Sequence, residues 1–341
     1  MSEKGVSRLG VAIAAVIIIV AAVAVAWIAL RPLEEAEEFK FAAIFPGSIQ
    51  DADYNTLGLI TVQSVGETFG ISTAYSERVA VPDSGRVMRE YADAGYNIIW
   101  AHGAQFNAYV LEVAAEYPDM SFIIESDFPL AEDAPKNLWN LDRNFHTGYY
   151  ALGVLAALKT ETNKVGYICG VELPFSYGEI NSAKQALDKY KPGAELIYAW
   201  VGDFNDPTKA RLQAEAMIAE GVDVIMSSVN LGNYGLFEGA RAADRDVWVT
   251  CKYTDKRDMI PECFLTAFVN DFSVPVNHAV EKIMAGEEGG YTKIEFGEGK
   301  GCYIQFPIAH VSSEIEDAVK KACDEIEAGT VPEKNLTKPT S

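Results

Sequence analysis

The feature that most constrains the fold is a regular alternation of short apolar runs with amphipathic segments, which begins at Phe39. Most of the apolar runs are rich in Val, Ile and Phe and lack strict apolar–polar alternation, as is typical of strands buried on both faces. Strands that alternate with helices predict parallel βαβ units. The predicted strands are residues 41–45, 71–75, 98–101, 121–125, 165–169, 195–200, 224–227, 247–250 and 265–269.

The segments between these strands carry helix signals. Pro207 suits a first helical turn, Asp206 is a plausible N-cap before it, and Gly221 fits the end of the same helix. The final predicted helix, residues 313–328, places apolar side chains on one face. The other predicted helices cover residues 56–69, 84–94, 107–117, 149–160, 177–190 and 236–244.

A polar interruption at residues 131–144 divides the alternation into two runs. It favours two doubly wound, parallel-sheet α/β lobes over the alternative of a single (β/α)₈ barrel. We expect lobe 1 to contain residues 40–142 and 256–287. Lobe 2 is expected to contain residues 143–255 and 288–329, and a flexible polar tail to follow at residues 330–341.

The N-terminus carries a second strong signal. Residues 9–30 contain no charge and are mostly Ala, Val and Ile, which is long enough to cross a bilayer core of about 30 Å. We expect residues 1–8 in the cytoplasm, a single transmembrane anchor at 9–30, a linker at 31–39 and the large domain outside the cell. A cleaved signal peptide is the alternative, but its apolar region would be about 7–15 residues.

Charge and cysteine content exclude several classes of function. The formal net charge is −21, which argues against a nucleic-acid partner. The five cysteines form no CxxC pair, so the sequence predicts no zinc site; outside the cell, Cys251, Cys263 and Cys302 are candidates for a disulfide. GxSxG, HExxH, P-loop and GxGxxG motifs are absent from the sequence. We therefore expect no catalytic residues, no metal and no cofactor.

The candidate ligand-binding residues follow the predicted strands, because ligands of open α/β sheets bind beyond the carboxyl ends of the strands. Aromatic rings there offer stacking surfaces, carboxylates accept from hydroxyls, and amides match the edges of a base. The candidates are Asp51, Tyr54, Asn55, His102, Gln105, Phe106, Asp127, Phe175, Phe204, Asn230, Lys252 and Asp255.

Some of these candidates have structural alternatives. The run from Asp51 to Asn55 resembles the start of a calcium loop, but Thr56 and Val62 replace the glycine and glutamate that such a loop needs. A helix N-cap or a ligand contact is the better interpretation of this run. His102 could equally be a packed loop residue, and Phe175 and Phe204 could simply fill the lobes.

Several stretches resemble the basic membrane protein (BMP), PnrA-like, family of ABC transporter substrate-binding proteins. The run from Asp51 to Asn55 is similar to the family's D-x-S-F-N element, with Tyr54 in place of Phe. Four longer stretches are similar to family motifs in the same order: AGYNIIWAHGAQF (94–106), VAAEYPDMSFI (113–123), GYYALGVLAALKTETNKVGYICG (148–170) and GDFNDPTKARLQAEAMIAEGVDVI (202–225). The resemblance covers roughly residues 40–330.

The resemblance implies a type I periplasmic-binding fold, with two lobes joined by three crossovers and a purine nucleoside bound between them. It implies that Asp51 and Asn55 belong to the site, with Asp127 a weaker correspondence. Where the family has an Asp suited to ribose hydroxyls, this chain has Lys252. This departure leaves a free nucleobase, a modified nucleoside or another polar solute as alternatives.

We therefore expect an extracytoplasmic binding protein that closes on its ligand by hinge motion and docks on ABC permease subunits. The hinge is expected near residues 128–145, 252–256 and 285–290. Two other classes stay open at this point: a membrane-anchored sensor of the same fold, and a nucleoside hydrolase-type enzyme.

Overall fold

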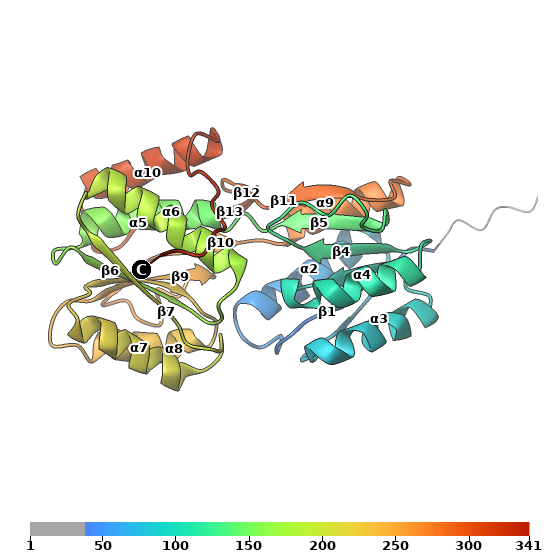
Figure 1. The fold of residues 1–341 in the computed structure, drawn as a ribbon, viewed down its shortest axis with the longest axis horizontal. Coiled ribbons are helices and arrows are strands. Elements are labelled where there is room, and N and C mark those ends of the chain that lie inside the picture. The colour runs from blue at the N-terminus through green and yellow to red at the C-terminus, as the bar shows by residue number, and fades with distance from the viewer. Residues whose placement is uncertain (1–37, 341) are drawn as a thin grey trace, which may run out of the picture. The chain divides into compact units, whose positions relative to one another are not determined.

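The computed structural model describes residues 38–340, and residues 39–340 form two α/β lobes (Figure 1). The strands of lobe 1 are short and almost fully buried at its centre, which explains their continuous apolar sequence. Its strands are β1 (Lys40–Ile44), β2 (Ser72–Ser76), β3 (Ile98–Ala101), β4 (Ser121–Glu125), β5 (Leu138–Asp142) and β11 (Gly290–Lys293). Its helices are α2 (Tyr54–Phe69), α3 (Ser84–Asp93), α4 (Asn107–Glu116) and α9 (Ser273–Met284).

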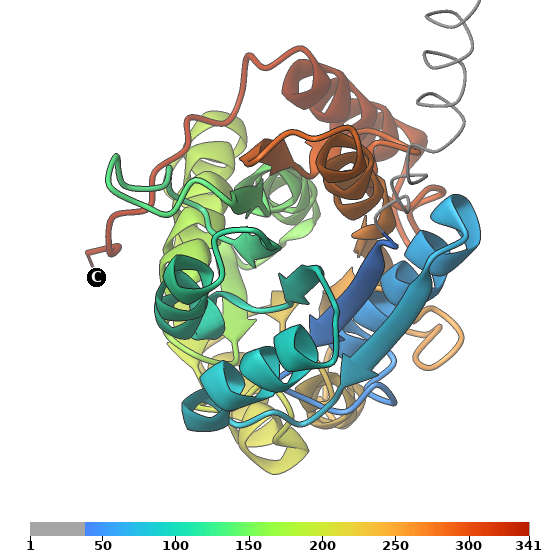
Figure 2. The same ribbon diagram turned by 90° about the vertical axis from the view of Figure 1, so that its right-hand side faces the viewer.

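The sheet of lobe 1 is parallel throughout and has the strand order β2-β1-β3-β4-β5-β11. Figure 2 looks onto this lobe, where α3 and α4 lie on one face of the sheet and α2 and α9 on the other. The order reverses direction between β1 and β3, which makes the loops after these two strands the edge where ligands of such sheets bind.

Lobe 2 repeats the same strand order. Its sheet runs β7-β6-β8-β9-β10-β13-β12, and β13 is antiparallel to β10. The strands are β6 (Lys164–Cys169), β7 (Glu195–Trp200), β8 (Val224–Ser228), β9 (Trp248–Tyr253), β10 (Phe264–Asn270), β12 (Glu295–Phe296) and β13 (Gly301–Ile304). The helices are α5 (His146–Lys159), α6 (Pro174–Tyr190), α7 (Pro207–Ala219), α8 (Gly232–Arg241) and α10 (Ser313–Glu327).

The chain crosses between the lobes three times, at residues 143–145, 271–272 and 294. The first crossover falls within the range expected from the sequence. The other two lie away from residues 252–256 and 285–290, because β10 pairs with β9 in lobe 2 and β11 pairs with β5 in lobe 1. Lobe 1 therefore takes α9 and β11 from the C-terminal half, rather than residues 256–287.

Two other expectations concern covalent and membrane features. The anchor expected at residues 9–30 lies outside the described residues, together with the cytoplasmic stretch and most of the linker. Within residues 38–340, the structure contains no helix of the length and apolarity that crossing a bilayer requires. All five cysteines are buried free thiols, so the disulfide expected among Cys251, Cys263 and Cys302 is not formed.

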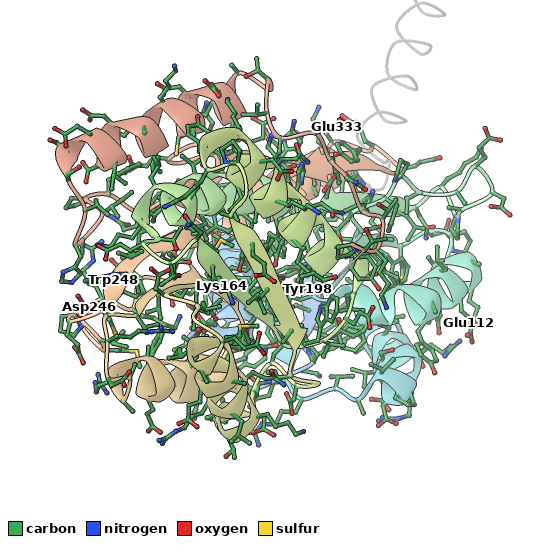
Figure 3. The ribbon with its side chains drawn as sticks, turned by 60° about the vertical axis from the view of Figure 1, so that its left-hand side comes forward. Glu112, Lys164, Tyr198, Asp246, Trp248 and Glu333 are labelled. Atoms are coloured by element: carbon green, nitrogen blue, oxygen red, sulfur yellow. The ribbon has the colours of Figure 1, made fainter. Side chains whose placement is uncertain are left out.

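The C-terminal residues 330–340, expected to be flexible, form a strap along α6. Asn181 on α6 donates to the carbonyls of Asn335 and Thr337 at 2.9 and 2.8 Å. Figure 3 labels Glu333, which exchanges two hydrogen bonds with Gln185, and Tyr198, whose hydroxyl donates to the Pro339 carbonyl.

The strap also reaches lobe 1, because Lys334 Nζ lies 2.6 Å from Asp142 Oδ2 at the end of β5. It thus links α6 to the first crossover. The polar sequence of the strap did not indicate that its backbone carbonyls would accept hydrogen bonds from α6.

We predict that a chain ending at Gly329 is less stable than the full chain. The deletion removes two hydrogen bonds from Asn181, two with Gln185 and the Lys334–Asp142 ion pair. Exposed contacts are worth about 0.5 kcal/mol each, so the free energy of unfolding should fall by about 2–3 kcal/mol. Chemical denaturation measures this change. The control is Lys338→Ala, which removes one exposed ion pair with Glu172 and should have little effect. Equal stability of the deletion and the full chain would contradict the strap.

Candidate functional site

A cavity of about 110 Å³ lies between the two lobes at the carboxyl ends of both sheets. It is bounded by the loops that follow β1 and β3 in lobe 1 and β6, β7 and β8 in lobe 2. The strand order reverses between β1 and β3 and between β6 and β8, where ligands of such sheets bind. The first crossover and the end of β9 complete it. The lining residues are Pro46, Gly47, Tyr54, Asn55, Gln105, Arg143, Leu173, Phe175, Phe204, Asn205, Asn230 and Tyr253.

Asp51 organises the lobe 1 loop without lining the cavity. One of its carboxylate oxygens accepts from the backbone N–H groups of Asp53 and Thr56, both at 3.0 Å, and the other accepts from the side chain of Asn55 at 2.6 Å. Asn55 in turn accepts from the backbone of Gly47 at 3.1 Å. A carboxylate at the positive end of a helix stabilises it, so Asp51 acts here as a cap of α2.

Tyr54 contacts two buried polar side chains of lobe 1. Its hydroxyl donates to Glu125 Oε2 at 2.6 Å, and its ring stacks on His102 with centroids 3.7 Å apart. His102 is fully buried, with one ring nitrogen 2.6 Å from Glu125 Oε1 and the other 2.8 Å from the Tyr54 carbonyl. His102 therefore positions the tyrosine ring and does not reach the cavity.

Arg143 brings a cation to the cavity from the first crossover, directly after β5. Its guanidinium forms a buried ion pair with Asp127 and lies over the rings of Phe175 and Phe145, at 5.0 and 5.5 Å. A cation against an aromatic face is favourable, more so when both are desolvated. This ion pair engages one oxygen of Asp127 and holds the arginine beside Phe175.

A second buried cation lies deeper in lobe 2. Lys252 and Glu179 are both fully buried and form an ion pair at 2.5 Å, and Tyr167 donates to the same carboxylate. Lys252 Nζ lies 3.4 Å from the centroid of the Phe145 ring. Burial lowers the pKa of the Lys252 ammonium, against the opposing effect of Glu179. This ion pair contacts the aromatic rings next to the cavity, and neither of its residues lines the cavity.

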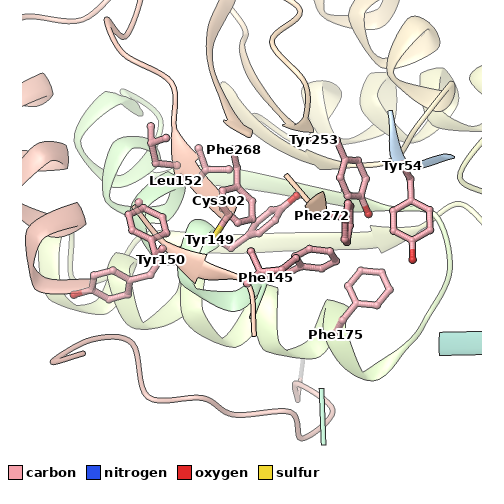
Figure 4. Close-up of a cluster of buried hydrophobic side chains, with 14 of the residues drawn as sticks. Tyr54, Phe145, Tyr149, Tyr150, Leu152, Phe175, Tyr253, Phe268, Phe272 and Cys302 are labelled. Carbon is pink, nitrogen blue, oxygen red and sulfur yellow. The ribbon is translucent and has the colours of Figure 1, made fainter. Parts of the chain in front are cut away.

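Buried aromatic side chains form a cluster next to the cavity, which we call the aromatic wall; Figure 4 labels Phe145, Tyr149 and Phe175 among its members. The rings of Phe175 and Phe204 are nearly parallel, with centroids 6.3 Å apart and planes at 23°. Phe204 can lie there because Gly170 has no side chain: a Cβ at that position would come within 2.2 Å of the Phe204 ring. Tyr253, also at the cavity, adopts a positive φ of 77°, which is strained for a bulky residue.

One ion pair joins the lobes directly. Asp53, at the start of α2 in lobe 1, pairs with Lys256 and accepts from the Thr254 hydroxyl at 2.9 Å, both from the loop after β9 in lobe 2. Thr254 also donates to the Ala52 carbonyl at 3.0 Å. Burial raises the pKa of the Asp53 carboxyl to about 7, against the opposing effect of Lys256.

Half of the residues selected from the sequence come together at the cavity: Tyr54, Asn55, Gln105, Phe175, Phe204 and Asn230. The other half have positions that the structure explains differently. Asp51 caps α2, His102 and Lys252 are buried behind the aromatic wall, and Asp127 pairs with Arg143. Phe106 is packed in the core of lobe 1, and Asp255 forms a half-exposed pair with Arg257.

Arg143 is the most informative lining residue that sequence reasoning missed. It follows β5, whose sequence Leu-Trp-Asn-Leu-Asp lies inside the polar interruption and was not recognised as a strand. An arginine directly after a fifth strand would have been selected by the same rule that selected the others. Among residues 38–340, no group of three or more His, Cys, Asp or Glu side chains is arranged to hold a metal ion.

Comparison with known proteins gives a consistent family signal. Residues 39–332 match the family model described as ABC transporter substrate-binding protein PnrA-like. Basic membrane protein A2 of Borrelia garinii subsp. bavariensis is 26% identical over 242 residues, which cover 70% of each chain.

Solved structures show the same fold. An ABC transporter solute-binding protein from Conexibacter woesei DSM 14684 superposes with a TM-score of 0.69 at 22% identity, covering 88% of this chain and 100% of that one. An ABC transporter solute-binding protein from Agrobacterium vitis, bound with α-D-tagatopyranose, superposes with a TM-score of 0.60 at 14% identity, covering 78% of this chain and 93% of that one. The two-lobe architecture is thus shared with solute-binding proteins.

The buried Asp53 carboxyl predicts a pH dependence of stability. In the unfolded chain this group releases its proton near its ordinary pKa of 3.8, whereas the folded protein retains the proton up to about pH 7. The folded state therefore binds more protons between these values, and the free energy of unfolding contributed by Asp53 falls as pH rises through this window, by an amount on the order of 3 kcal/mol.

The measurement compares the protein with Asp53→Asn by chemical denaturation at pH 5 and pH 8. The stability of the unaltered protein relative to the variant should be lower at pH 8 than at pH 5. Asp119→Asn, at an exposed position, is the matched control and should show no such difference. If the stability of the unaltered protein relative to Asp53→Asn instead increases from pH 5 to pH 8, the prediction is contradicted.

Proposed function

The chain belongs to the PnrA-like family of ABC transporter substrate-binding proteins, and we propose that it captures a small polar solute with a flat ring, of the purine nucleoside or nucleobase type, for an ABC importer. The observation that carries this proposal is the cavity at the reversal points of both strand orders. Its walls combine apolar rings with a few convergent polar groups, the usual make-up of a small-molecule site.

The chemistry of the lining supports a flat, nitrogen-rich ligand. Phe175 and Phe204 present nearly parallel ring faces, on which a planar heterocycle can stack. The amides of Asn55, Gln105 and Asn230 and the guanidinium of Arg143 surround them. Amides and guanidinium groups match the donor and acceptor pattern of base edges.

Closure of the lobes around the ligand is the mechanism that we propose. Three short crossovers permit a hinge motion, and the Asp53–Lys256 contact between the lobes is available only when they are together. A ligand that contacts both lobes binds the closed state more tightly and shifts the population towards it. No covalent step is required.

Delivery to the importer completes the proposal. The apolar run at residues 9–30 would hold the binding domain on the outer face of the membrane and raise its local concentration near the permease subunits. The acidic surface of the chain, with a formal net charge of −21, would keep it from adhering to anionic lipid.

We predict that adding a purine nucleoside or nucleobase raises the thermal unfolding temperature of the protein, because a ligand that binds only the folded state stabilises it. A screen by thermal shift against purine compounds, pyrimidine compounds, amino acids and sugars tests this. Sugars belong in the screen because the Agrobacterium vitis protein holds one in the same fold. A shift with a sugar and none with any purine would contradict the proposed ligand class.

The aromatic wall gives a sharper test. Phe204→Ala removes one stacking face and should weaken binding of the purine about 10- to 100-fold, since a stacked base is worth about 1–3 kcal/mol. Phe69→Ala is the matched control: Phe69 is also half-buried, but it lies at the far end of α2, away from the cavity. Calorimetry measures both affinities. Equal losses in the two variants would show that the effect is on folding and not on the site.

A further inference from the structure

Each carboxylate close to the cavity contacts a partner within the protein through at least one of its oxygens. Asp51 accepts from the start of α2, Asp53 pairs with Lys256, and Asp127 pairs with Arg143. In the part of the chain that the structure describes, no acidic side chain lines the cavity. The hydroxyl pair of a sugar or ribose donates hydrogen bonds and needs strong acceptors, for which ionised carboxylates are the most capacious side chains. The cavity therefore lacks the groups that suit a diol.

Two buried polar atoms on lining residues lack a hydrogen-bond partner within residues 38–340. They are Nε of Arg143, which is a donor, and Oδ1 of Asn230, which is an acceptor. The two residues are 5% and 6% exposed. Each such buried atom destabilises the protein while it stays unpaired. A ligand that offers one acceptor and one donor would recover that free energy when the two side chains turn these atoms towards it.

The positions of these two residues place the ligand between the first crossover and lobe 2. Arg143 lies on the first crossover, and Asn230 lies on the loop after β8 in lobe 2. The stacked pair Phe175 and Phe204 lies in the same wall, so the ligand should be flat as well as polar. An oxopurine has this combination, since its carbonyl oxygen and N7 are acceptors that match a guanidinium and its ring N–H is a donor that suits an amide oxygen.

The volume of the cavity also favours a base without an attached ribose. At about 110 Å³, it is small beside the roughly 300–1,000 Å³ of sites that hold drug-sized ligands. A base with an attached ribose would need more room than a base alone, together with acceptors for the additional hydroxyls.

We propose that the cavity selects a free oxopurine base, such as hypoxanthine, guanine or xanthine, over the corresponding ribonucleoside and over sugars. Arg143 and Asn230 are the specificity-determining residues: the guanidinium donates to the acceptor edge of the base, and the amide oxygen accepts from a ring N–H. This inference rests on the proposed function and narrows its ligand class.

Calorimetry of the full chain with hypoxanthine, inosine, adenine and glucose tests the selection. Hypoxanthine should bind at least tenfold more tightly than inosine, which adds only ribose, and than adenine, which lacks the carbonyl. Inosine binding as tightly as hypoxanthine would overturn the inference and leave the proposed function intact. Binding of none of the three purines would overturn the proposed function itself.

Substitutions of Arg143 and Asn230 test whether these two residues determine the preference for an oxopurine base. Arg143→Lys keeps a positive charge beside Asp127 but loses the planar guanidinium, and it should weaken hypoxanthine binding at least tenfold, with a smaller loss for adenine. Arg257→Lys, in the half-exposed pair with Asp255, is the control and should leave the affinity unchanged. If Arg143→Lys lowers the amount of folded protein, Asn230→Leu carries the test, again with a tenfold loss expected. Unchanged hypoxanthine affinity in a folded variant overturns the assignment.

Discussion

The buried acid–base pairs around the cavity determine which side chains are left to line it. Four acidic side chains lie at or behind the cavity, and each faces a basic partner: Asp53 with Lys256, Asp127 with Arg143, Glu179 with Lys252, and Glu125 with His102. Removing one member of such a pair is expensive because it leaves an isolated charge out of water. The pairs therefore fix the positions of these side chains and leave the cavity to rings, amides and one guanidinium.

The aromatic wall depends on the same pairs. Lys252 lies over the ring of Phe145, and Arg143 lies over the rings of Phe145 and Phe175, so two cations contact these rings. On the lobe 1 side, His102 and Glu125 hold the ring of Tyr54. A rigid set of rings costs little further order when a flat ligand stacks on it, which is the benefit of preorganisation for binding.

The sequence predicted the α/β class and most strands because buried parallel strands read as continuous apolar runs. It could not predict the short polar strand β11, Gly-Tyr-Thr-Lys, and it could not show that β10 pairs in lobe 2 whereas β11 pairs in lobe 1. The rule that loops after strands carry the site found Tyr54, Phe175 and Asn230. It also selected Asp51, because a carboxylate that caps a helix and one that holds a ligand look alike until the backbone positions are known.

Arg143 was absent from the predicted site for a related reason. Strand β5 contains Asn140, and both it and its flanks are polar enough to read as a connection. Its burial comes from neighbours far away in sequence, β4 on one side and β11 on the other. Only the tertiary pairing reveals the strand, and with it the arginine at its carboxyl end.

We expect the solute to bind between the lobes, with its ring on Phe175 and Phe204 and its acceptor edge towards Arg143. A crystal structure of the protein with hypoxanthine is the decisive measurement. Electron density for the base should lie in the interlobe cavity, in contact with side chains from both lobes. Density for the base at any other surface, with the cavity filled only by water, would contradict it.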